Sequence, residues 1–353
     1  MKLVSILGDS VSTFEGYNPP DYAVFYDKVF QRRNGLQTVY DTWWAKVNQA
    51  LNAFLCINNS YSGSRISGQS FPSAVSEERL NNLCNSGYSP DFILIYMGFN
   101  DFGYGVKISK PGTDGIRDAD LSFFSDAYEY LLCTLRRKYP DSRIVCGTLM
   151  RTFMKNQPDW DFPEYYAGIE FEKYNNVIRS AAAKSDGSSL ADLSAQGKRY
   201  ETLDGTHPTI AGHQTLAEAW ISSLADLDLL KPSIESCIKM YRSNKDSDSA
   251  VYMIFEALMR ERVLLPVNEC GKLVGLPVNY QTIIPIFTSP NEISKEEPVR
   301  LKPVFLSDNL DALMSAGLNL IVNPFSQADR QFIIPYPLID KILRPLAETI
   351  KKT

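Results

Sequence analysis

A serine near the amino terminus and one of only two histidines could together carry out nucleophilic chemistry. Ser10 directly follows a short apolar run, as the third residue of Gly8-Asp9-Ser10. A serine hydroxyl is a poor nucleophile until a base takes its proton, and histidine titrates in the range that this requires. Asp204 stands three residues before His207 and could accept the other ring N–H, which would fix the tautomer.

Two further segments could stabilise the negative charge that such chemistry develops. Asn100 comes three residues after an apolar run that ends at Met97, and a side-chain amide at a strand end is a fixed donor. Gly63 ends the segment Asn58–Gly63, and glycine lets a backbone N–H approach a reacting oxygen closely. Each segment taken alone could instead be an ordinary turn or a capping residue.

The remaining histidine and the cysteines do not suggest a metal site. His213 falls inside a predicted helix and has no acidic partner, which favours a packing role over that of a second base. The six cysteines are scattered without a Cys-x-x-Cys pair, so we expect reduced, mostly buried thiols. Zinc requires clustered ligands. We therefore predict no metal and no cofactor.

The elements that position these residues alternate between short apolar runs and helical stretches. Strands are predicted at Leu3–Leu7, Phe54–Ile57, Phe92–Met97, Arg143–Thr148 and Ser189–Asp192, and helices near Thr42–Leu51, Val75–Leu83, Leu121–Lys138, Phe171–Lys184 and Thr209–Leu227. This alternation predicts an open three-layer α/β/α domain with a five-stranded parallel sheet. Ligands bind at the carboxyl ends of such strands, so the four candidate segments are expected to meet there.

The pattern changes in the last third of the chain. The polar stretch Ser243–Ser249 is typical of a linker or of a loop before a second domain. We predict a first domain at 1–230, a linker at 231–249 and a smaller α+β domain at 250–353. Its expected elements are helices at Ala250–Arg260, Asn309–Ala316 and Leu338–Ile350 and strands at Leu264–Asn268, Thr282–Phe287 and Leu318–Val322.

Composition excludes several classes of protein. The chain has 353 residues, 44% of them apolar and 22% charged, with a net charge of −5, which is ordinary for a soluble globular protein. No basic block suggests nucleic acid, and no run approaches the roughly 18 apolar residues that cross a bilayer. The apolar stretch at the amino terminus is too short for a signal peptide, so we expect a cytoplasmic protein without membrane attachment.

Taken in order, the four segments resemble those of the SGNH hydrolases, also called the GDSL esterase/lipase family. The resemblance runs from Lys2 to about Leu227. It implies a flavodoxin-like three-layer fold and hydrolysis of carboxylic esters. Val11 replaces the leucine of the older family name, and Ser60 stands where many members carry glycine. Neither departure removes a residue that the family uses in catalysis.

The same resemblance implies a role for each candidate residue. Ser10 would be the nucleophile, His207 the base and Asp204 the acid that orients it. The backbone N–H groups of Ser10 and Gly63, with the Asn100 side chain, would form the oxyanion hole. The reaction would pass through an acyl-enzyme that water hydrolyses.

Aromatic and basic residues near these segments bear on the substrate. The stretches Phe14–Trp44 and Phe153–Tyr166 are rich in rings, which suit sugars or flat acyl groups, although several of them could pack under the loops instead. We favour a short acyl ester, such as acetyl on a carbohydrate. Arg65, Lys107 and Arg151 could meet an anionic group of a substrate or be ordinary surface charges.

Two other functions use the same residues. One is a binding protein that keeps the fold but not turnover, which the complete set of five residues disfavours. The other is cleavage of a thioester or amide at the same site, which the sequence does not separate from ester hydrolysis.

The last hundred residues resemble the SseB N-terminal-like domain. The residues that carry this resemblance are Tyr252–Leu258, Val263–Val267, Ile284–Ser289 and Leu320–Pro324. These motifs are apolar and imply a fold rather than an activity. The segment contains no histidine, so we interpret it as a module that binds a protein partner, with a purely stabilising role as the alternative.

Overall fold

The computed structural model describes residues 2–85, 87–109, 119–230, 232–243, 248–278, 280–289, 292, 300–327 and 330–350. The chain forms two compact units, one of Lys2–Leu230 and one that begins at Lys231. Each unit has its own apolar core.

The first unit is built on a five-stranded sheet in which every neighbouring pair of strands is parallel. The strands, in their order across the sheet, are β2 (Ala53–Ser60), β1 (Lys2–Gly8), β3 (Phe92–Tyr96), β4 (Arg143–Gly147) and β8 (Ser188–Ala191). This order is the flavodoxin-like one. The predicted α/β class and the five-stranded parallel sheet are confirmed.

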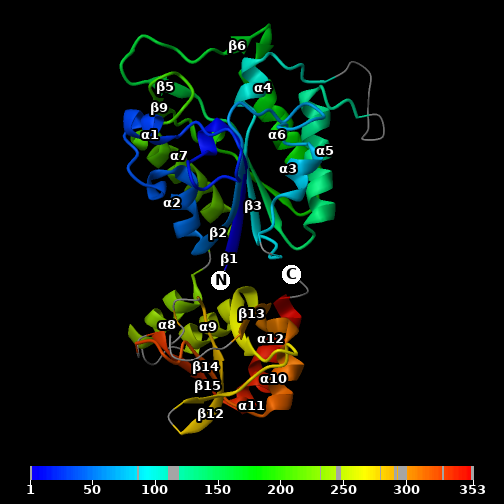
Figure 1. Ribbon diagram of the computed structural model, residues 1–353, viewed down its shortest axis with the longest axis vertical. Coiled ribbons are helices and arrows are strands. Elements are labelled where there is room, and N and C mark those ends of the chain that lie inside the picture. The colour runs from blue at the N-terminus through cyan, green and yellow to red at the C-terminus, as the bar shows by residue number, and fades with distance from the viewer. Residues whose placement is uncertain are drawn as a thin grey trace. The chain divides into compact units, whose positions relative to one another are not determined.

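Helices cover both faces of this sheet (Figure 1). The helices of the first unit are α1 (Lys28–Asn34), α2 (Trp43–Ala50), α3 (Glu77–Asn81), α4 (Phe99–Gly103), α5 (Phe124–Lys138), α6 (Phe171–Lys184) and α7 (Ile210–Asp226). Figure 1 shows α2 and α7 on one face and α3, α5 and α6 on the other. Helices α2 and α7 begin where threonine hydroxyls accept backbone N–H groups, Thr42 from Ala45 and Thr209 from Gly212.

Short elements lie in the connections. They are the 3₁₀ turns η1 (Ser10–Ser12), η2 (Val39–Asp41) and η4 (Ser194–Gln196) and the paired strands β5 (Thr152–Met154) with β9 (Tyr200–Thr202) and β6 (Tyr165–Tyr166) with β7 (Ile169–Glu170). Strands β5 and β6 overlap the two ends of Phe153–Tyr166, which the sequence marked only as an aromatic loop, and β7 follows it.

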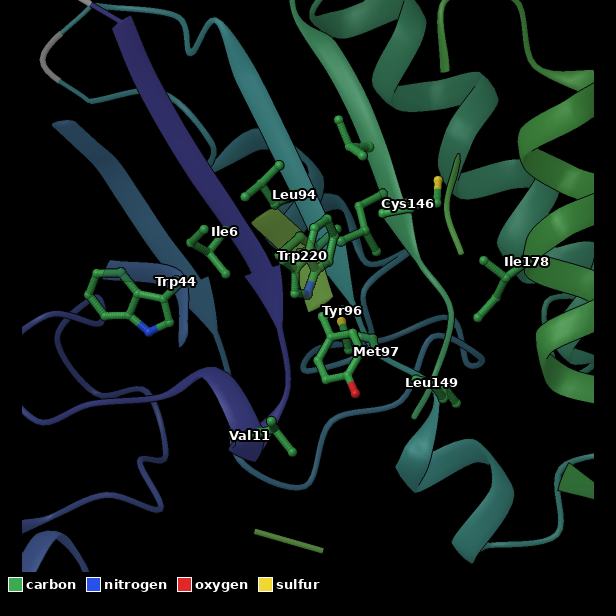
Figure 2. Close-up of a cluster of buried hydrophobic side chains, with 14 of the residues drawn as sticks. Ile6, Val11, Trp44, Leu94, Tyr96, Met97, Cys146, Leu149, Ile178 and Trp220 are labelled. Atoms are coloured by element: carbon green, nitrogen blue, oxygen red, sulfur yellow. The ribbon is translucent and has the colours of Figure 1, made fainter. Parts of the chain in front are cut away.

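The core of the first unit lies on both sides of the central strands. Figure 2 shows Ile6, Leu94 and Cys146 on three neighbouring strands, with Trp220 of α7 close to them. Trp220 stacks on Trp43 of α2, with ring centroids 5.2 Å apart. Since both indoles are fully buried, this stack ties α2 and α7 together against one face of the sheet.

The second unit combines two small sheets with helices. Its elements are α8 (Ile234–Ser243), α9 (Asp248–Arg260), β10 (Arg262–Val267), β11 (Leu276–Val278), β12 (Gln281–Ile286), β13 (Arg300–Phe305), η6 (Leu306–Asp308), α10 (Leu310–Ala316), β14 (Leu320–Val322), β15 (Phe332–Ile334), α11 (Tyr336–Leu338), the π-helical turn η8 (Ile339–Leu343) and α12 (Arg344–Ile350). Strands β10 and β13 form one sheet, and β11, β12, β14 and β15 form the other. No described helix of either unit is both long and apolar enough to cross a bilayer.

Two expectations for this part of the chain need correction. Residues 234–243, expected within a linker at 231–249, form helix α8, because Ile234, Cys237 and Ile238 make an apolar stripe that packs against α9. Of the polar stretch expected as a linker, residues 244–247 lie outside the described residues. The single helix expected at Leu338–Ile350 is the succession α11, η8 and α12.

Candidate active site

Three of the four candidate segments follow the carboxyl ends of adjacent strands. Ser10 lies in η1 directly after β1, Gly63 follows β2, and Asn100 is the second residue of α4 after β3. The fourth segment, with Asp204 and His207, precedes α7. Because the strands are parallel and adjacent, their carboxyl ends share one edge of the sheet.

The structure brings Ser10, His207 and Asp204 into one hydrogen-bonded row. Ser10 Oγ lies 2.9 Å from His207 Nε2, although 197 positions separate the two residues in the sequence. His207 Nδ1 lies 2.8 Å from Asp204 Oδ2. This arrangement can pass a proton from the serine hydroxyl to Nε2 while the carboxylate holds the Nδ1 proton.

Phe25 fixes the plane of the His207 ring. The two rings are stacked, with centroids 3.4 Å apart and an angle of 7° between their planes. The Phe25 backbone N–H donates to Thr13 Oγ1, and the Thr13 hydroxyl donates to the Ser10 carbonyl. The stack is therefore tied to the same turn that carries Ser10. The sequence showed Phe25 only as one ring of an aromatic stretch.

Asp204 is held as a carboxylate. Oδ1 accepts the N–H groups of Thr206 and His207, at 3.0 and 2.8 Å. Partial burial alone would raise the pKa of Asp204, but the hydrogen bond and the charge of His207, with the two backbone N–H groups, outweigh it and lower the pKa to about 2. Asp204 is therefore negative at neutral pH and can stabilise a protonated His207.

Close packing holds the turn that carries Ser10. A Cβ atom at Gly8 would lie 2.6 Å from Ser12 Cβ and from Ser60 Oγ, so only glycine fits there. Asp9 caps the turn by accepting the Val11 N–H at 3.1 Å. Burial raises the pKa of Asp9 to about 7, and the N–H of Val11 opposes this shift. Ser10 itself is only 5% exposed.

The two remaining candidates can offer N–H groups at the same edge. Gly63 has a φ of +78°, in the left-handed region that favours glycine. The Asn100 amide donates to the Ser64 carbonyl at 2.9 Å and lies 3.5 Å from Asp9 Oδ2. One amide hydrogen is therefore bonded to the Ser64 carbonyl. Because the contact with Asp9 is long, the other amide hydrogen can bond to a stronger acceptor.

An arginine that the sequence analysis did not single out fastens these segments together. Arg79 of α3 is fully buried, and its guanidinium donates to the carbonyls of Gly8, Asn59 and Pro72 at 2.8–2.9 Å. Burial lowers the pKa of Arg79 to about 10, so it remains charged at neutral pH. It joins the ends of β1 and β2, which precede Ser10 and Gly63. No sequence signal distinguishes it from a surface arginine.

The other residues considered from the sequence lie elsewhere. His213 is fully buried in α7, and its Nδ1 accepts the Trp43 N–H at 3.2 Å. Burial lowers the pKa of His213 to about 3, which leaves the ring neutral at neutral pH. Arg151 pairs with Glu164 at 3.1 Å. Lys107 is exposed.

Residues 2–156 match the model of the GDSL-like Lipase/Acylhydrolase family. This stretch carries Ser10, Gly63 and Asn100 but ends before Asp204 and His207. The match supports a GDSL-like acylhydrolase domain, and hence a hydrolase, in the first unit. No curated protein matches the chain.

Several solved structures are similar to part of the chain. A Bacteroides ovatus protein described as a GDSL-like lipase is 26% identical with a TM-score of 0.49, over 64% of this chain and 99% of its own. A Bacteroides uniformis protein with the same description is 28% identical, also with a TM-score of 0.49, over 64% and 96%. A family two carbohydrate esterase from Clostridium thermocellum, in complex with cellohexaose, is 19% identical with a TM-score of 0.39, over 65% of each chain. The resemblance of residues 250–353 to the SseB N-terminal-like domain stays a prediction.

Proposed function

We propose that the protein is a serine esterase that cleaves carboxylic esters through an acyl-enzyme on Ser10. The observation that carries this proposal is the row of two short contacts, Ser10 Oγ to His207 Nε2 at 2.9 Å and His207 Nδ1 to Asp204 Oδ2 at 2.8 Å. A serine is activated by a base within hydrogen-bond reach that a third group orients, and this row has that connectivity.

In the first half of the reaction, Ser10 Oγ attacks the ester carbonyl carbon while His207 Nε2 takes the hydroxyl proton. The carbonyl oxygen becomes an oxyanion, which the N–H groups of Ser10 and Gly63 and the Asn100 amide stabilise. His207 then gives its proton to the leaving alcohol, and the carbon–oxygen bond to that alcohol breaks. The acyl group remains on Ser10.

In the second half, His207 takes a proton from water as the water oxygen attacks the acyl carbonyl. A second tetrahedral intermediate forms in the same oxyanion hole. It collapses as the proton passes from His207 to Ser10 Oγ, which releases the carboxylic acid. Asp204 stays ionised throughout and stabilises the imidazolium in both halves.

The substrates proposed are short-chain acyl esters, acetyl esters of carbohydrates among them. A pocket of about 390 Å³ is lined in part by Gly63; its volume is near the lower end of the range for small-molecule sites and suits a short acyl group. Tyr165 and Tyr166 on β6 are exposed, and exposed aromatic rings can stack on sugar rings.

Fluorophosphonate labelling, read by intact mass, tests the proposal without a choice of substrate. The wild type should gain the mass of one probe, and Ser10→Ala should gain none. Ser185→Ala, which removes a serine at the end of α6, is the matched control and should label like the wild type. A folded wild type that does not label would refute the proposal and favour a binding protein on this fold. Thioester and amide analogues of the best ester would then show which bond is preferred.

We also propose that the second unit binds a protein partner and that the protein acts in the cytoplasm. The second unit contains no histidine, so it lacks the usual general base of a nucleophilic site. All six cysteines are free thiols, as expected in a reducing compartment. Affinity capture with and without the second unit tests the first proposal, and localisation of the tagged full chain tests the second.

A further inference from the structure

The pocket that Gly63 helps to line is formed mainly by one loop of the first unit, residues 63–73. Its walls include Arg65, Phe71 and Tyr104 together with four serine residues. None of the described residues that line it is acidic. A short acyl group that enters this pocket would therefore meet hydroxyl groups, two aromatic rings and one positive charge.

The loop is built onto the residues that follow β3. The Asp101 carboxylate accepts the N–H groups of Ile66 and Ser67 at 2.8 and 3.0 Å, and it is fully buried. Asn100 donates to the Ser64 carbonyl. Hence two consecutive residues of α4 hold the loop in place. Helix α4 thus carries the proposed oxyanion donor Asn100 and also holds the loop that lines the pocket, so the pocket is formed before a substrate arrives.

The charge of Arg65 is available to a ligand. Its guanidinium lies over the Tyr104 ring, 5.4 Å from the centroid, and Arg65 forms no ion pair among the described residues. Burial raises the pKa of Asp101 and the charge of Arg65 opposes this shift, but the Asp101 oxygens already accept two backbone N–H groups. A carboxylate would complement the guanidinium.

We propose that Arg65 selects esters whose acyl group ends in a carboxylate, that is, monoesters of short dicarboxylic acids. This inference rests on the proposed esterase function. Gly63 and Arg65 both line the pocket, so an acyl group held at the Gly63 N–H and seated in the pocket extends along a wall that carries Arg65. The pocket volume of about 390 Å³ suits a short chain.

The position of the pocket relative to His207 assigns it to the acyl group rather than to the alcohol. His207 protonates the leaving alcohol, so the alcohol must lie beside the imidazole. Of the proposed catalytic and oxyanion-hole residues, Gly63 lines the pocket, whereas Ser10, Asn100 and His207 do not. Because Gly63 would hold the carbonyl oxygen, while His207 and the Phe25 ring stacked on it lie outside the lining, we assign the pocket to the acyl group, which stays on Ser10 in the acyl-enzyme.

The test compares two p-nitrophenyl esters with five-carbon acyl groups, the pentanoate and the glutarate monoester, which differ in a terminal methyl or carboxylate. The readout is the ratio of kcat/KM for the glutarate to that for the pentanoate. A charge-assisted hydrogen bond lost in Arg65→Gln should lower this ratio by roughly 10-fold to 100-fold. Arg137→Gln, an exposed arginine in the last turn of α5, is the matched control and should keep the wild-type ratio.

The outcomes separate this inference from the function on which it rests. If Arg65→Gln keeps the wild-type ratio, the inference is overturned while esterase activity stands. If the wild type hydrolyses neither ester, the proposed function fails, and binding of free glutarate decides the role of the pocket. Glutarate should then raise the Tm of the wild type but not that of Arg65→Gln, and an equal effect on both proteins would overturn the inference.

Discussion

Replacing Asp204 with asparagine keeps the size of the side chain but puts two donor hydrogens on one of its terminal atoms. Asp204 Oδ1 accepts the N–H groups of Thr206 and His207, whereas Oδ2 faces only His207 Nδ1. Because two backbone donors lie on one side, the amide oxygen of Asp204→Asn should stay with them and its NH₂ should face Nδ1. Nδ1 must then accept a hydrogen bond, which moves the ring proton to Nε2.

The shifted tautomer removes general-base catalysis, because a protonated Nε2 cannot take the proton of Ser10. The nucleophile and the oxyanion donors remain in place, so substrate binding should change little. The same exchange in a triad of this connectivity lowers kcat by about 10⁴. That factor corresponds to about 5 kcal/mol of lost transition-state stabilisation. We expect a loss of this order in kcat with KM close to that of the wild type.

The assay is hydrolysis of p-nitrophenyl acetate by Asp204→Asn, with Asp27→Asn as the matched control. Asp27 caps α1 by accepting the N–H groups of Val29 and Phe30 at 2.9 Å, but no imidazole is bonded to it. Asparagine caps helices about as well as aspartate, so this control should keep wild-type kcat. A folded Asp204→Asn that loses less than about tenfold in kcat would refute the tautomer argument.

Three further predictions follow from the same site and fold. Asn100→Ala should lower kcat by about 10²–10³ with little change in KM, because it removes one oxyanion donor, and steady-state kinetics on the acetate ester measure this. A KM effect alone would show that Asn100 binds substrate instead. The folded pKa of His213, about 3, lies below the unfolded value near 6.5, so its contribution to stability is present above pH 6.5 and is lost as pH falls toward 3. His213→Asn removes this titrating group but can still accept the backbone N–H of Trp43. Its Tm should therefore fall less on acidification than that of the wild type, while kcat stays near the wild-type value. Inactivation would instead make His213 part of the site. The first unit alone, ended at Leu230, should fold and hydrolyse the acetate ester, because its core is separate from that of the second unit, and a folded but inactive fragment would contradict this.

The first unit was predictable because its central strands β1, β3 and β4 are mostly apolar and buried on both faces. Strands β1 and β3 are fully buried, and such runs stand out in a sequence. Helix α1 gave no such signal, since only Gln31 and Asn34 are buried on it and its limits come from the Asp27 cap and from Gly35. Strand β13 was missed for the related reason that none of its residues is buried. Helix α8 could have been found, because Ile234, Cys237 and Ile238 follow helical spacing.

The candidate site was predictable where local motifs carry the chemistry. Ser10, Gly63 and Asn100 each follow a recognisable strand, and Asp204 precedes His207 at a spacing that lets the carboxylate reach the ring. Residues that act through the fold were not predictable. Arg79 reaches carbonyls on three different segments, and Phe25 meets His207 across 182 positions, so only the folded chain shows their partners.

The separation of 197 positions between Ser10 and His207 has a consequence for how activity is acquired. No fragment that ends before position 207 contains the base, and the turn that carries Ser10 is completed only when β2, β1 and β3 have paired. Contacts between distant parts of a chain form late, because the chain between them must first be ordered. On a ribosome, the site therefore cannot work until the first unit is nearly complete. Recovery of activity after dilution from denaturant would accordingly report the final closure of the sheet rather than its early collapse.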